Sequence, residues 1–192
     1  MSCGSSKHSR EKERAINRKY DRFYVILKEI RVGGIIVTVE VGKTVTDFEL
    51  PNQNGETTRL SDFRGKNVVL YFYPKDMTPG CTTEACDFRD HHESFADLDA
   101  VIIGVSPDPV ERHQKFIEKH DLPFLLLADE DHKIAEDFDV WKLKKNFGKE
   151  YFGIERSTFI IDKDGVLQKE YRKVRVKGHV EEALQYIREN LQ

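Results

Sequence analysis

Short apolar runs separated by charged segments are the main feature of this chain. Three of them, Val68–Tyr73, Val101–Val105 and Phe124–Leu127, are almost uninterrupted by polar residues. Apolar runs of roughly four to eight residues are typical of strands that are buried on both faces of a sheet. We therefore expect these segments to form the centre of a sheet.

Two hairpins are predicted beside these strands. Asn54-Gly55 separates Asp47–Leu50 from Thr57–Leu60, and an Asn-Gly pair between two alternating segments is a strong hairpin signal. Further along, Ser157–Ile161 and Val166–Tyr171 flank a turn that ends in glycine. The first pair predicts a hairpin before the sheet, and the second pair predicts another after it.

Helices are predicted in the segments between the strands. Residues 84–98 and 180–191 carry apolar side chains at helical spacing, and residues 134–138 fit a short helix. A further helix is expected to start with Asp108 as its cap and Pro109 in its first position. Strands that alternate with helices predict a central sheet covered by helices, which is a three-layer α/β domain.

This domain is expected to span residues 37–192, because residues 1–36 do not fit its pattern. Residues 1–31 contain nine Lys or Arg against four Asp or Glu, whereas the remainder contains 22 against 30. An acidic domain argues against a nucleic-acid-binding protein. We expect residues 1–36 to form a basic N-terminal extension that is flexible or non-native, with the natural start near Val37. A solvated tail is favoured over an arm for an anionic partner.

Hydropathy and cysteine content indicate a compartment. The longest apolar runs are far shorter than a membrane span, and no secretory signal opens the chain. Three cysteines are too few for a disulfide scaffold in a chain of 192 residues. We therefore expect a cytoplasmic protein without a membrane segment.

Two of the three cysteines lie in the stretch PKDMTPGCTTEAC, residues 74–86. A predicted central strand ends just before Pro74, and a helix is expected to begin near Cys81. Open α/β sheets place their sites at such strand ends, and the positive end of a helix favours a thiolate. Because the thiolate is the nucleophilic form of cysteine, Cys81 is predicted to be an activated nucleophile, with the Thr78 hydroxyl within reach.

The spacing of Cys86, five residues after Cys81, bears on disulfide formation. In an intact helix the two Cα atoms would lie about 8–9 Å apart, whereas a disulfide needs less than roughly 7 Å. A bond between them therefore requires the first turns of the helix to unwind. A cysteine that is oxidised first and meets its partner after local unfolding fits a thiol peroxidase. The alternative is that Cys86 is an inert, buried thiol.

From about residue 39 to its end, the sequence resembles the peroxiredoxins, and within them the bacterioferritin-comigratory, or peroxiredoxin Q, group. Pro74, Thr78 and Cys81 reproduce the PxxxTxxC motif of that family. Residues 155–162 resemble the late strand that carries the family's arginine, which makes Arg156 the candidate. Val45-Thr46 departs from the Ala-Pro that the family usually has there, which leaves the conformation of the first strand open.

The resemblance implies a thioredoxin-like three-layer α/β/α fold with a central mixed sheet and an N-terminal hairpin. It implies that Cys81 attacks a hydroperoxide while the Thr78 hydroxyl hydrogen-bonds the sulfur and the peroxide oxygens. Pro74 would shelter the pocket, and Arg156 would stabilise the thiolate and polarise the peroxide. Cys86 matches the resolving cysteine of part of the group, which implies an intramolecular disulfide that thioredoxin or a similar dithiol reduces. No metal or other cofactor is implied, and a monomer is expected.

Other functions stay open on the same fold. One is a redox sensor that is oxidised without efficient turnover, and another is a copper-binding chaperone, which would need a closer cysteine pair and a histidine late in the chain. A general disulfide oxidoreductase would need a CxxC motif, whereas Cys81 is followed by Thr-Thr-Glu. A metal set made of Cys81, Cys86, His91 and His92 has a poor spacing for tetrahedral zinc.

Overall fold

The structure is a computed structural model that describes residues 39–146 and 148–192. The extension expected at residues 1–36, with Cys3 in it, lies outside the described residues, so its boundary stays a prediction.

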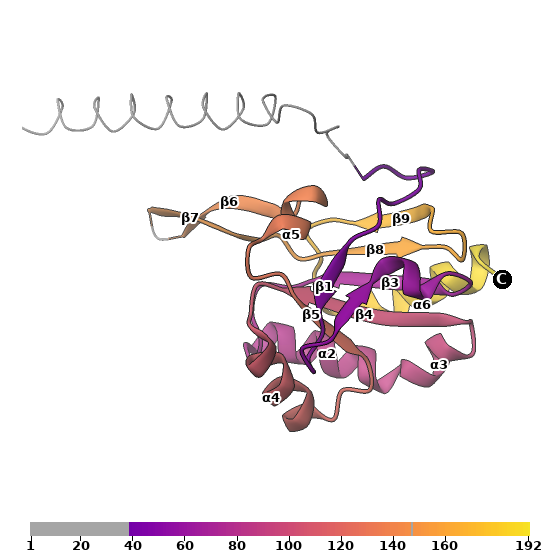
Figure 1. The fold of residues 1–192 in the computed structure, drawn as a ribbon, viewed down its shortest axis with the longest axis horizontal. Coiled ribbons are helices and arrows are strands. Elements are labelled where there is room, and N and C mark those ends of the chain that lie inside the picture. Colours follow the sequence, from indigo (N-terminus) through magenta and orange to yellow (C-terminus); the bar gives the residue numbers. More distant parts are fainter. Residues whose placement is uncertain (1–38, 147) are drawn as a thin grey trace, which may run out of the picture. The chain divides into compact units, whose positions relative to one another are not determined.

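A five-stranded mixed sheet forms the centre of the domain (Figure 1). Strands β3, β4 and β5 run parallel to one another. On the other side of β3, β8 pairs antiparallel with β3, and β9 pairs antiparallel with β8. The strands lie in the order β5-β4-β3-β8-β9, with the bounds β3 (Asn67–Phe72), β4 (Ala100–Ser106), β5 (Leu125–Ala128), β8 (Ser157–Ile161) and β9 (Leu167–Tyr171). Every residue of β3 is buried, which explains the continuous apolar run in this segment. The predicted mixed sheet is confirmed.

The two faces of the sheet are covered by different elements because successive side chains of a strand point to opposite faces. Val69 and Tyr71 of β3 belong to one hydrophobic cluster, and Leu70 and Phe72 belong to the other. The first cluster includes residues of four helices: α2 (Pro79–Asp90), α3 (His92–Ala96), α4 (Val110–His120) and α6 (His179–Asn190). The second includes residues of α5 (Lys133–Asp137) and of the N-terminal hairpin. The three-layer prediction is therefore confirmed.

The N-terminal hairpin is present as predicted. Strand β1 (Glu49–Pro51) pairs antiparallel with β2 (Thr57–Arg59), which leads into a 3-10 helix, η1 (Leu60–Phe63). Gly55 has a φ of +77° in the turn, which is a conformation that favours glycine. The Asn52 side chain accepts hydrogen bonds from two N–H groups of the same turn, at 2.8 and 3.1 Å. The second predicted hairpin corresponds to β8 and β9.

A third hairpin was not expected from the sequence. Strands β6 (Trp141–Asn146) and β7 (Lys149–Ile154) pair antiparallel and extend away from the central sheet in Figure 1. Lysines interrupt the apolar residues of this segment, so it contains no continuous apolar run. Leu143, Tyr151 and Phe152 are instead exposed to 43–50%. Because the hairpin hides little apolar surface, hydrophobic periodicity does not reveal it.

The helix predicted over residues 84–98 is longer and is divided in two. It begins at Pro79, which suits the first position of a helix, and α2 ends at Asp90. The ring nitrogen Nδ1 of His91 lies 2.9 Å from the carbonyl oxygen of Asp87, which also accepts the His91 N–H. After this break, α3 turns so that Phe95 is fully buried beside Phe88, with ring centroids 6.0 Å apart.

The prediction that Asp108 caps the next helix is wrong. Helix α4 begins at Val110, and Pro109 takes the cap position. The Asp108 carboxylate instead accepts hydrogen bonds from the N–H of Asp76 at 2.6 Å and the hydroxyl of Ser106 at 3.2 Å. It also forms an ion pair with Arg112 at 3.1 Å. The side chain is thus used to join three segments and is not available to the helix N-terminus.

Candidate active site

Cys81 lies in the first turn of α2, directly after the loop that leaves the carboxyl end of β3. Its side chain is buried and its thiol is free. The unpaired N–H groups and the positive dipole end of the helix surround this position, which favours a negative sulfur. The structure therefore places Cys81 at the helix start that the sequence predicts.

The topology of the sheet brings Arg156 to the same place. Because β8 runs antiparallel to β3, Ser157 at its start pairs with Phe72 at the end of β3. Arg156, one residue before Ser157, consequently lies beside the loop that leads to Cys81. Its Nη2 donates a hydrogen bond to the Cys81 sulfur at 3.1 Å, and its Nη1 donates to the Glu84 carboxylate. The positively charged guanidinium group of Arg156 thus lies directly against the sulfur atom of Cys81.

Glu84 is a member of this site that sequence reasoning missed. Its side chain is fully buried one turn after Cys81 and forms an ion pair with Arg156. Burial raises the pKa of Glu84 to about 7, although the charge of Arg156 acts in the opposite direction. Its second oxygen, Oε1, has no hydrogen-bond partner among the described residues. The sequence offered little signal, because an acidic residue near a helix start usually faces solvent.

The raised pKa of Glu84 predicts a pH-dependent loss of stability. Folding raises the pKa from 4.5 to about 7, so the folded state binds a proton that the unfolded state has released. The free energy of unfolding therefore falls as the pH rises through this window. Relative to Glu84→Gln, the parent is expected to lose on the order of 3 kcal/mol between about pH 4.5 and 7, measured by urea unfolding. Glu93→Gln, an exposed site on α3, is the control. Parallel curves for the parent and Glu84→Gln would contradict this assignment.

Thr78 and Pro74 occupy the loop before α2. Thr78 is the residue before the first helical position, and its carbonyl accepts the Thr82 N–H at 2.8 Å. Its hydroxyl donates to the Lys75 carbonyl at 3.0 Å and is not directed to the sulfur in this structure. Pro74 is half-buried at the end of β3. Both residues therefore lie on the segment that leads to Cys81, and their catalytic roles stay predictions.

Cys86 lies further along α2, half-buried and free. Helix α2 is continuous from Pro79 to Asp90, so both cysteines lie in an intact helix. The unwinding that a disulfide would need is therefore a second state of the molecule, different from the one described.

Lys144 of the β6–β7 hairpin is a second cationic side chain, after Arg156, that interacts electrostatically with Cys81. Burial lowers the pKa of Lys144, and the charge of Arg156 acts in the same direction, while Glu155 and Cys81 oppose the shift. Its ammonium group donates a hydrogen bond to the Ile154 carbonyl. The charge of Lys144 thus contributes to the field at Cys81. It could not be placed there from the sequence because the hairpin itself was not predicted.

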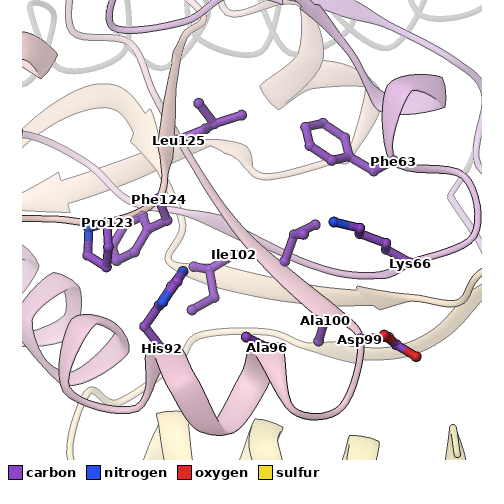
Figure 2. Close-up of a pocket in the computed structure, with 11 residues that line it drawn as sticks. Phe63, Lys66, His92, Ala96, Asp99, Ala100, Ile102, Pro123, Phe124 and Leu125 are labelled. Atoms are coloured by element: carbon purple, nitrogen blue, oxygen red, sulfur yellow. The ribbon is translucent and has the colours of Figure 1, made fainter.

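A pocket of about 310 Å³ lies elsewhere on the domain (Figure 2). It is lined by Phe63, by His92 of α3, and by Ala100 and Leu125 at the amino ends of β4 and β5. Since β3, β4 and β5 are parallel, this is the opposite end of the strands from Cys81. None of the predicted site residues lines this pocket, so the chemistry does not belong to it.

Comparison with known proteins decides the family. The model of the AhpC/TSA family matches residues 41–170, which is more than half of the chain. The chain belongs to the AhpC/TSA family. The matched region contains the loop, α2 and the start of β8, and thus Cys81, Arg156 and Glu84.

Within the AhpC/TSA family, this chain is similar to peroxiredoxins of the Bcp, or Q, group. It is 71% identical to peroxiredoxin Bcp of Bacillus subtilis over 153 residues, which cover 80% of this chain and 98% of that protein. It is 40% identical to peroxiredoxin Bcp of Escherichia coli over 79% of this chain and 97% of that protein. The solved structure of Xanthomonas campestris peroxiredoxin Q matches with a TM-score of 0.73 at 40% identity, over 76% of this chain and 92% of that one. The AhpC/TSA chain is thus a peroxiredoxin, and its activity is that of a thiol peroxidase.

Membership in the peroxiredoxins implies a hydroperoxide substrate and a thiol reductant. In the part of the chain that the structure describes, no helix is both long and apolar enough to cross a membrane.

Proposed function

We propose that Cys81 is the peroxidatic residue. Its thiolate attacks the terminal oxygen of a hydroperoxide, a sulfur–oxygen bond forms, and the O–O bond breaks. The departing oxygen takes a proton and leaves as water or as an alcohol, so the peroxide is reduced while the sulfur becomes a sulfenic acid. The observation that carries this proposal is the 3.1 Å hydrogen bond from Arg156 to the Cys81 sulfur at the start of α2.

The other site residues are assigned by what each can contribute. Arg156, held by Glu84, stabilises the thiolate and the charge that develops on the departing oxygen. The Thr78 hydroxyl must leave the Lys75 carbonyl to serve the sulfur and the peroxide, which a rotation of its side chain provides. Pro74, half-buried at the strand end, limits access of water to the sulfur.

Cys86 is proposed as the resolving residue. Its thiolate attacks the sulfur of the Cys81 sulfenic acid, a disulfide forms, and the oxygen leaves as water. The five-residue spacing on α2 means that the amino-terminal turns of the helix unwind before this step. Thioredoxin or a similar dithiol then reduces the disulfide. Reduction of organic hydroperoxides, action as a monomer and a cytoplasmic location belong to the same proposal. The similar bacterioferritin comigratory protein of Xanthomonas campestris has alkyl peroxide reduction activity, which supports the first of these.

A copper chaperone is disfavoured by the charge at the sulfur, since the Arg156 guanidinium on Cys81 would repel a metal cation.

The test is rapid mixing of reduced protein with an equimolar amount of hydrogen peroxide. Trp141, which stacks on His132 with ring centroids 3.8 Å apart, provides a fluorescence signal. Oxidation that is orders of magnitude faster than that of free cysteine is expected, followed by a Cys81–Cys86 disulfide identified by peptide mass spectrometry. Fast oxidation without that bond would make this a one-cysteine enzyme. Oxidation at the rate of free cysteine would remove the assignment of Cys81, and fast oxidation without turnover by a dithiol would favour a sensor.

A further inference from the structure

A buried pair of a carboxyl group and an imidazole ring holds the loop between β3 and α2, and the chemistry above does not use it. Asp76 of this loop and His113 of α4 are both fully buried. Oδ2 of Asp76 lies 2.8 Å from Nδ1 of His113, and Oδ1 accepts the Tyr73 hydroxyl at 2.6 Å. The backbone N–H of Asp76 donates to Asp108 at 2.6 Å, and its carbonyl accepts from Arg112 at 3.1 Å. All four hydrogen-bonding groups of this loop residue are therefore fixed by other residues.

His113 is in hydrogen-bond contact through both of its ring nitrogens. Its second ring nitrogen, Nε2, lies 3.2 Å from the carbonyl oxygen of Leu127 in β5. Both ring nitrogens thus have an oxygen partner in the interior of the domain. The pair joins the loop to α4 and to β5 at once.

The loop needs such support because of its backbone. Met77 has a φ of +59°, in the left-handed region that residues other than glycine rarely adopt. Met77 lies between Asp76 and Thr78, and the Thr78 carbonyl accepts the first hydrogen bond of α2 from Thr82. The position of Asp76 therefore sets the direction in which the chain enters the helix that carries Cys81.

We propose that Asp76 and His113 are positioning residues for peroxide reduction. They act through the loop, which keeps Thr78 and Cys81 in place beside Arg156. They also confine the unwinding of α2 to residues after Thr78, so that the loop stays fixed while Cys81 moves toward Cys86. This inference rests on the proposed role of Cys81.

The double variant Asp76→Asn/His113→Gln tests the proposal, because it replaces both partners with uncharged amides and leaves neither partner facing the original group alone in the core. The second-order rate of Cys81 oxidation by hydrogen peroxide is expected to fall by at least about tenfold, since the reacting groups lose their alignment. The subsequent rate of Cys81–Cys86 bond formation is expected not to fall, because the loosened loop does not oppose unwinding. Both rates come from one stopped-flow trace with quenched samples for mass spectrometry.

Ile187→Val in α6 is the matched control, because Ile187 belongs to the same hydrophobic cluster as Cys81 but is distant from the loop in sequence. It should lose stability and keep both rates. An unchanged oxidation rate in the double variant, or equal slowing of both steps, would overturn the proposal. Asp76→Asn alone serves the same comparison if circular dichroism shows that the double variant does not fold. Slow oxidation of the parent would instead remove the proposed function, and this inference with it.

Discussion

Replacing Cys81 with serine is expected to reduce the turnover of hydrogen peroxide by at least about a thousandfold. Serine has nearly the same size and would keep its place in the first turn of α2. Its hydroxyl does not ionise at neutral pH, however, and its oxygen cannot accept the peroxide oxygen to form a sulfenic acid. Consumption of peroxide in the presence of dithiothreitol, and separately of a thioredoxin system, measures the loss.

The other two cysteines provide matched controls for this substitution. Cys3→Ser, in the extension outside the described residues, is expected to leave turnover unchanged. Cys86→Ser is expected to keep one fast oxidation of Cys81 and to lose the intramolecular disulfide, so that mass spectrometry finds an oxidised Cys81 without a bridge. Turnover by Cys81→Ser at a rate comparable to the parent would mean that another group is the nucleophile.

Replacing Arg156 with methionine is expected to slow the oxidation of Cys81 by about a hundredfold to a thousandfold. The guanidinium donates a hydrogen bond to the sulfur at 3.1 Å, and methionine fills a similar volume without a donor or a charge. The substitution is best combined with Glu84→Gln, because Glu84 is buried and would otherwise lose its cation. Single-turnover stopped-flow measurement gives the rate without the recycling steps.

Arg156→Lys separates charge from geometry. A lysine keeps the positive charge but lacks the planar, two-armed group that reaches both Cys81 and Glu84, so an intermediate rate is expected. Arg175→Met, at an exposed position, should match the parent. If the methionine variant oxidises within about threefold of the parent rate, Arg156 has no part in the peroxide step.

The central sheet could be predicted from the sequence because its strands are buried on both faces. The runs that became β3, β4 and β8 contain mainly apolar residues and have the short length that favours a buried strand over a buried helix. The β6–β7 hairpin is the opposite case, since it is stabilised by local backbone pairing and leaves Leu143, Tyr151 and Phe152 exposed. The position of a helix cap also escaped prediction, because Asp108 bonds to Asp76, which is distant in sequence.

Of the candidate site, the position of Cys81 at the start of a helix could be predicted, and the groups that contact it could not. Cys81 follows a recognisable strand and precedes a recognisable helix, so local signals were sufficient. Arg156 was found only through resemblance, because its contact with Cys81 depends on the pairing of β8 with β3. Glu84 and His113 are polar residues within helices, where the usual expectation is exposure. Their burial follows from tertiary packing that no local pattern encodes.

The amino terminus of α2 lacks a side-chain cap, because the Thr78 hydroxyl is turned toward the Lys75 carbonyl. An uncapped turn opens at a lower cost in free energy. In the proposed mechanism, a sulfenic acid on Cys81 reaches Cys86 only after this turn has opened, so the opening time sets how long the sulfenic acid persists. During that wait a second peroxide molecule can carry the sulfur on to the irreversible sulfinic acid. A helix without a cap shortens the wait, so the enzyme would tolerate bursts of peroxide that inactivate one with a firmly capped helix.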